Sequence, residues 1–153
     1  MNAKDRRLLI TRFKEIVAKT DPQFLPFNGA SPYVFPSHLY FSYERPGRGM
    51  LFLDLSINQK SDKSDFTLQF GWSRLGRFPE VLSVHYYMDD LAAGIRRYSQ
   101  PEYMQRVMMF LGRDTWWCFD GSNPEQCEEV LKVVEDILRA KIIPYLVGAL
   151  EHE

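Results

Sequence analysis

Residues 38–72 read HLYFSYERPGRGMLFLDLSINQKSDKSDFTLQFGW, and this stretch decides the fold. Apolar and polar side chains alternate in three runs, at 38–44, 50–58 and 65–72. Strict alternation is typical of a strand with one buried face. The turn Pro46-Gly47-Arg48-Gly49 and the polar residues 59–64 separate the runs. The stretch therefore predicts an antiparallel meander of three strands with one apolar face.

Helical spacing flanks this sheet on both sides. Asn2 is a candidate N-cap for a helix over 3–20, and the segment 122–125 provides cap residues and an early proline for a last helix. The apolar stripes of the two helices are Leu9, Phe13, Ile16 and Val17, and Val130, Leu131, Val134, Ile137 and Leu138. Pro144 is expected to kink or interrupt the last helix.

The remaining segments are less regular. Five proline and glycine residues between 22 and 36 predict an irregular connection. Residues 81–88 have the pattern of a strand, and we expect a short helix over 89–98, a second helix from Pro101 closed by Gly112, and a strand over 115–119. The expected architecture is one α+β domain over 1–153. It has two layers, with the first and last helices covering one face of the antiparallel sheet.

Composition restricts the possible partners. The formal net charge is −1, with 19 Lys and Arg against 20 Asp and Glu, so the cationic excess that nucleic acid demands is missing. The apolar run after the basic N-terminus is three residues long, so neither a leader peptide nor a membrane span is expected. The two cysteines, Cys118 and Cys127, predict no disulfide framework and favour a reducing cytoplasm. Both are expected to be small buried groups, although a helix N-terminus near Cys127 could lower its pKa.

Charge is nevertheless unevenly distributed. Residues 1–20 carry a balance of +4 and residues 120–153 a balance of −5. We expect the two terminal helices to attract one another, and a charge dipole that binds a partner is the alternative.

No catalytic motif, cofactor motif or metal-ligand spacing is present. His38, His85 and His152 are too far apart in the sequence to suggest a metal site. Asp54 is expected on the face opposite Leu53 and Leu55, with no second carboxylate forced beside it. We therefore predict no catalytic residue, no cofactor and no metal.

The segment Trp72-Ser73-Arg74-Leu75-Gly76-Arg77-Phe78-Pro79 carries the strongest binding signal. It combines two guanidinium groups with two aromatic rings directly after a strand, a combination that is enriched at protein interfaces. The predicted binding residues are Trp72, Arg74, Arg77, Phe78 and Trp117. The structural alternative is that the aromatic rings close the end of the sheet while the arginines are solvated. Trp116 and Trp117 point to opposite faces of their strand, so at most one of them fills the core from that face.

The stretch Leu51–Pro79, LFLDLSINQKSDKSDFTLQFGWSRLGRFP, together with the last helix resembles small uncharacterised bacterial α+β proteins, some of which accompany toxins as immunity proteins. The similarity rests on a strand-turn-strand pattern followed by Trp-Ser-x-x-Gly-x-Phe-Pro. It implies a bacterial α+β protein whose task is interaction, and it transfers no catalytic residue.

Two functions are therefore expected from the sequence. The first is a non-enzymatic module that binds another protein, with an immunity-type protein that occludes a toxin as its sharpest form. The alternative is a small-ligand-binding protein or enzyme on the other face of the sheet. That site would hold an anionic group at Arg74 and Arg77, with Asp54 or His85 as polar helpers. Leu150-Glu151-His152 resembles the start of a vector-derived tail, and no role is assigned to it.

Overall fold

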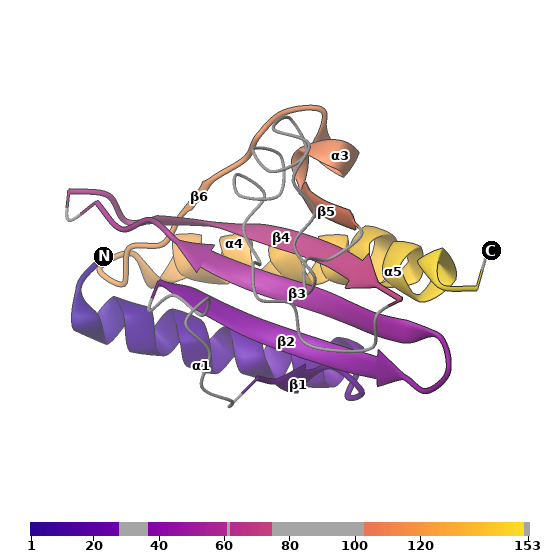
Figure 1. Cartoon of the computed structure of the whole chain (residues 1–153). Coiled ribbons are helices and arrows are strands. Elements are labelled where there is room, and N and C mark those ends of the chain that lie inside the picture. The colour runs from indigo at the N-terminus through magenta and orange to yellow at the C-terminus, as the bar shows by residue number, and fades with distance from the viewer. Residues whose placement is uncertain (28–36, 61, 75–102, 152–153) are drawn as a thin grey trace.

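The structure is a computed structural model, and it describes residues 1–27, 37–60, 62–74 and 103–151. An antiparallel sheet forms one layer and helices form the other, which confirms the predicted two-layer α+β fold (Figure 1). The strands are β1 (Leu25–Pro26), β2 (His38–Arg45), β3 (Gly49–Ile57), β4 (Asp65–Ser73), β5 (Tyr103–Arg106) and β6 (Trp117–Cys118). The helices are α1 (Ala3–Thr20), α3 (Met108–Leu111), α4 (Pro124–Ile137), the π-helical turn η1 (Leu138–Ile142) and α5 (Ile143–Ala149).

The predicted meander is the centre of the sheet. Its strands follow the order β1-β2-β3-β4-β5, and β6 pairs with the beginning of β4. Leu53 lies opposite Phe41 on β2 and opposite Phe70 on β4. Residues directly opposite one another share a face of the sheet, so this row defines the apolar face that the alternation predicts.

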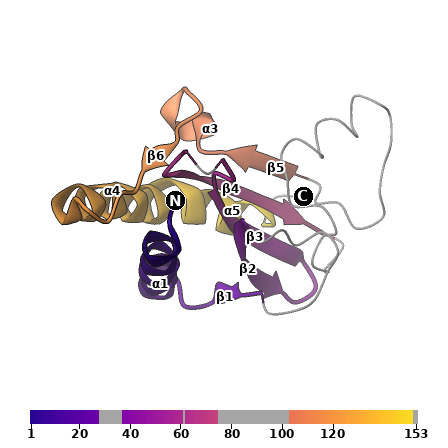
Figure 2. The ribbon, with the colours of Figure 1, turned by 90° about the vertical axis from the view of Figure 1, so that its left-hand side faces the viewer.

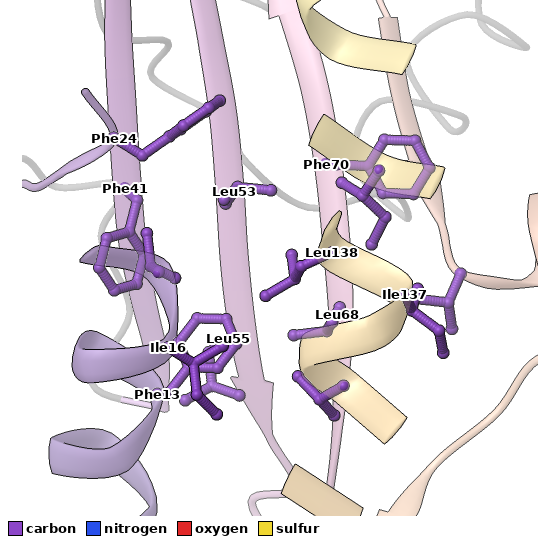
Figure 3. Packing of buried hydrophobic residues seen from close by; sticks show 14 of the residues in the cluster. Phe13, Ile16, Phe24, Phe41, Leu53, Leu55, Leu68, Phe70, Ile137 and Leu138 are labelled. Carbon is purple, nitrogen blue, oxygen red and sulfur yellow. The ribbon is translucent and has the colours of Figure 1, made fainter. Parts of the chain in front are cut away.

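Within the described residues, α1 and α4 cover this apolar face (Figure 2). Figure 2 shows α1 and α4 on the same side of the strands. In Figure 3, Phe13 from α1 and Leu138 from η1 point toward Leu53 and Leu55 of β3. All four side chains are at most 2% exposed, so one continuous core joins both helical segments to the sheet. We call this side of the sheet the helix face and the opposite side the polar face.

The two terminal helices also contact each other directly. The guanidinium of Arg12 on α1 makes a bidentate ion pair with Glu128 on α4. Nζ of Lys19, also on α1, lies 2.9 Å from Oε1 of Glu135, also on α4. These pairs confirm the expectation that the opposite charges of the terminal segments attract one another.

Helix capping follows the predicted residues. The side chain of Asn2 accepts a hydrogen bond of 2.8 Å from the Asp5 amide, and Asn123 caps α4 in the same way. The buried Asp5 carboxylate in turn accepts a bond of 3.1 Å from the amide of Gly121. This bond joins the first turn of α1 to the loop that precedes α4.

Pro144 changes the last helix without breaking it. A proline lacks the amide proton that an α-helix needs and clashes with the carbonyl four residues earlier. The chain accommodates it with η1, a wider turn directly before α5. The predicted interruption is therefore a local π turn inside a continuous helical segment.

Two predictions in the second half of the chain are wrong. The expected helix from Pro101 does not form over 103–106, because this segment pairs as β5 with residues 69–72 of β4. Only Met108–Leu111 is helical, and Gly112 ends it with a φ of 76°, as predicted. Cys118 is exposed, because its register with Asp65 places it at an end of the sheet, on the polar face. The segments 81–88 and 89–98 lie outside the described residues.

Candidate functional site

The β2–β3 hairpin packs closely against the end of β4. Gly49 has a φ of 138°, and a Cβ atom at this position would lie 2.2 Å from the carbonyl oxygen of Ser73 and 2.8 Å from the Cα of Arg74. Only glycine permits such a close approach at this φ. The contact places Arg48, in the hairpin turn, beside Arg74, which follows β4.

Trp72 positions one of these arginines. The guanidinium carbon of Arg74 lies 4.7 Å from the centroid of the indole ring, which is a cation–π geometry. Trp72 is itself half-buried and packs against the core. The sequence left open whether these residues bind a partner or close the sheet. In the structure the ring packs against the core, and the exposed Arg74 side chain lies over it.

An open hollow forms where the hairpin, the end of β4 and the C-terminal segment meet. We call it the hairpin hollow, and it is lined by Gly47, Arg48, Arg74, Leu150 and Glu151. Arg48 donates a long hydrogen bond of 3.5 Å to the carbonyl of Leu150 and forms no ion pair within the described residues. The hollow therefore presents guanidinium donors that are well suited to a carboxylate or a phosphate.

One carboxylate of the chain already lies at this hollow. Glu151 accepts a hydrogen bond of 2.8 Å from Arg45, at the end of β2, and this bond raises the pKa of Arg45 above its ordinary value. Leu150, one residue earlier, is only 3% exposed and belongs to the core. Leu150 and Glu151, two of the three residues to which the sequence assigned no role, thus anchor and line the site.

Of the other predicted binding residues, Trp117 lies in the described part of the chain, and it is far from this hollow. Trp117 pairs with Phe66 near the beginning of β4, about 20 Å along the strand from Trp72. Its ring packs on Phe66 with centroids 5.7 Å apart, on the helix face. Arg77 and Phe78 lie outside the described residues, as does His85.

A second group of polar residues lies on the polar face. Nδ1 of His38 is 2.7 Å from Oδ2 of Asp54, and Gln69 donates a bond of 3.0 Å to the same oxygen. Asp54 is 2% exposed, and burial raises its pKa, while the hydrogen bond from His38 and the charge of Arg106 act in the opposite direction. Its other oxygen, Oδ1, is buried without a hydrogen-bond partner.

Asp54 does lie on the face opposite Leu53 and Leu55, as predicted, but its partner His38 was missed. The pairing register of the β2–β3 hairpin could have indicated that His38 lies beside Asp54. A turn that pairs Arg45 with Gly49 also pairs Tyr40 with Asp54, which makes His38 a diagonal neighbour of Asp54. The pair is a short hydrogen bond between an imidazole and a buried carboxylate. Within the described residues no three His, Cys, Asp or Glu side chains are grouped to hold a metal ion.

Cys127 offers no activated nucleophile. Its thiol is buried and donates a hydrogen bond to the carbonyl of Asp120. Burial raises the pKa of the thiol, and the charge of Asp5 raises it further. The alternative of a thiol activated by the helix N-terminus is therefore wrong.

The second hollow, between α1 and α4, is charged but internally neutralised. Arg12 and Lys19, two of its cations, are paired with Glu128 and Glu135 across the helix interface, and the third, Lys132, is paired with Asp136 of α4. The hairpin hollow is therefore the better candidate for binding. No helix in the described part of the chain is long and apolar enough to span a membrane.

Comparison with known proteins identifies no relative. No protein family, no curated protein and no solved structure matches this chain.

Proposed function

We propose that this protein is a non-enzymatic binding module that recognises an acidic surface of another protein through the hairpin hollow. One observation carries the proposal: Arg48 and Arg74, from separate parts of the chain, line one open hollow because the hairpin turn packs against the end of β4. Guanidinium groups beside aromatic area are typical of residues that dominate binding energy at protein interfaces.

The stacking of Arg74 on Trp72 favours binding in a second way. Ordering a free arginine side chain on association costs entropy, and a ring that already restrains it reduces that cost. The planar guanidinium can then offer two parallel N–H donors to a carboxylate. Lysine would not reproduce this geometry.

In its sharpest form, the proposal makes the protein a bacterial immunity-type protein that covers the active surface of a toxin in the cytoplasm. The resemblance of residues 51–79 and the last helix supports this form, as does the low number of cysteines. A partner with clustered carboxylates on its active surface would match the chemistry of the hollow.

Calorimetric titration with a hexaglutamate peptide tests the proposal. We expect Arg48→Ala and Arg74→Ala each to weaken binding by about 1 kcal/mol or more, roughly a fivefold change in Kd. Arg74→Lys should restore little of the loss. The control is Arg113→Ala, which removes an exposed arginine after α3 and should leave the affinity unchanged. Equal affinity of the wild type and the Arg48 and Arg74 variants would refute the proposal.

The alternative, a site for a small anionic ligand, has the same hollow in its favour. Citrate titrated beside the peptide separates the two functions. Tighter binding of citrate than of the peptide, lost in Arg48→Ala, would favour the small ligand. Tighter binding of the peptide favours a protein partner, because contacts beyond a single carboxylate cluster then contribute.

A further inference from the structure

We infer that the group bound in the hairpin hollow is a carboxylate, and that Glu151 is an internal carboxylate which the partner's carboxylate displaces. The inference rests on the proposed function and adds to it the chemistry of the ligand and a mode of regulation. Three observations lead to it: the position of Glu151, the exposure of its ion pair with Arg45, and the long hydrogen bond of Arg48.

Glu151 is held at the hollow by its neighbour. Leu150 is 3% exposed and packs in the core directly after α5, so the residue that follows emerges at the hollow instead of in open solvent. The Glu151 side chain is 49% exposed, and its Oε1 lies 2.8 Å from Nη2 of Arg45. A carboxylate therefore already fits one of the guanidinium groups at this place.

The ion pair between Arg45 and Glu151 is only partly shielded from water. An ion pair with one half-exposed partner is screened by water and salt and contributes little to stability. A ligand that offers several carboxylates can replace it without a large loss, because the guanidinium of Arg45 keeps an equivalent partner. In the free protein the carboxylate at the hollow is that of Glu151, and in the complex it is that of the ligand.

Each of the two neighbouring arginines also makes one long hydrogen bond to the backbone. Arg45 and Arg48 donate bonds of 3.5 Å to the carbonyls of Val147 and Leu150, which belong to the last turn of α5 and the residue after it. This distance is at the limit for a hydrogen bond, whereas charge-assisted bonds to carboxylates are about 2.7–2.9 Å long. A carboxylate entering the hollow would therefore gain a stronger bond from Arg48 than the one that Arg48 now donates to the carbonyl of Leu150.

The substitution Glu151→Gln tests the inference. It keeps the size of the side chain and removes its charge, so a carboxylate ligand no longer has to displace an anion. We expect hexaglutamate to bind this variant about three to five times more tightly than the wild type at low salt. The gain should disappear when Arg48→Ala is added. Glu129→Gln is the matched control, because it removes one negative charge from an exposed position on α4, away from the hollow.

Each outcome bears on a different claim. Equal affinities of Glu151→Gln and Glu129→Gln, with Arg48→Ala still weakening binding, would overturn the displacement and leave the proposed function standing. Insensitivity to Arg48→Ala in both backgrounds would overturn both. A gain for citrate and the peptide but not for inorganic phosphate supports a carboxylate ligand, and a larger gain for phosphate contradicts it. Urea unfolding of each variant shows whether it is folded before it is titrated.

Discussion

At the scale of single residues, two glycines of the hairpin turn have different structural roles. Gly47 has a φ of 75° and no atom within 4 Å of a would-be Cβ, whereas Gly49 has a φ of 138° and lies against Ser73 and Arg74. We expect Gly47→Ala to cost about 1 kcal/mol of stability through backbone strain alone. Gly49→Ala adds a collision with backbone atoms and should cost roughly 2–4 kcal/mol.

Urea unfolding of the two variants measures this difference. The Gly49 variant should also bind the acidic peptide more weakly, because separating the hairpin from β4 moves Arg48 away from Arg74. Equal losses of stability would show that the close approach of the hairpin is not required.

Asp54 predicts a pH effect with a definite sign. Burial raises its folded-state pKa above the ordinary carboxyl value of 3.8, so its ionisation opposes folding. The wild type should lose this part of its stability as pH rises from the ordinary value through the raised one. Asp54→Asn cannot ionise, and we expect its stability relative to the wild type to increase with pH.

Urea unfolding between pH 4 and 8 measures this trend, with the exposed Asp62→Asn as a control that should show no such trend. A variant that becomes less stable than the wild type as pH rises would mean that the ionised pair with His38 stabilises the fold. The absolute stabilities include the loss of the hydrogen bond to His38, so the slope with pH is the quantity to compare.

At the scale of elements, the buried stripe of α4 should be essential to stability. Leu131 is 3% exposed and belongs to the core, while Val133, two residues later, is 45% exposed. Leu131→Ala should lower the free energy of unfolding by about 2–4 kcal/mol through lost burial and the cavity left behind. Val133→Ala should change it by less than about 0.5 kcal/mol. A loss below that value for Leu131→Ala would show that this face does not support the core.

Elements with their own local signals could be predicted from the sequence, and those defined by pairing could not. α1 has a capping residue and a long stripe, and its predicted bounds of 3–20 are those observed. β5 has four residues, too few for alternation to show, and Met104, Val107, Met108 and Leu111 happen to have helical spacing. Its conformation is decided by β4, a partner that lies more than 30 residues away in sequence.

The residues of the candidate site divide in the same way, into those with a local sequence signal and those brought in by tertiary packing. Trp72 and Arg74 are neighbours in sequence, and their combination was sufficient to single them out. Arg48 and Glu151 join them only through the close approach of the hairpin and the docking of α5, which no local pattern encodes. The sequence therefore predicts the Arg74 side of the hollow but not the sides that Arg48 and Glu151 form.

At the scale of the whole molecule, the contact between α1 and α4 decides what the uneven charge does. Arg12 and Glu128 form a bidentate pair with side chains 33% and 59% exposed, so screening limits its contribution to about 1 kcal/mol or less. A double-mutant cycle with Arg12→Ala and Glu128→Ala should give a coupling of that size at low salt, and a smaller one at 0.5 M salt. Lys132 and Asp136, exposed and within one helix, are the reference pair and should give no more than about 0.5 kcal/mol.

A coupling of zero for Arg12 and Glu128 would mean that the terminal charges do not hold the helices together. The charge dipole would then be available to a partner, and the hairpin hollow would have a competitor as the binding surface.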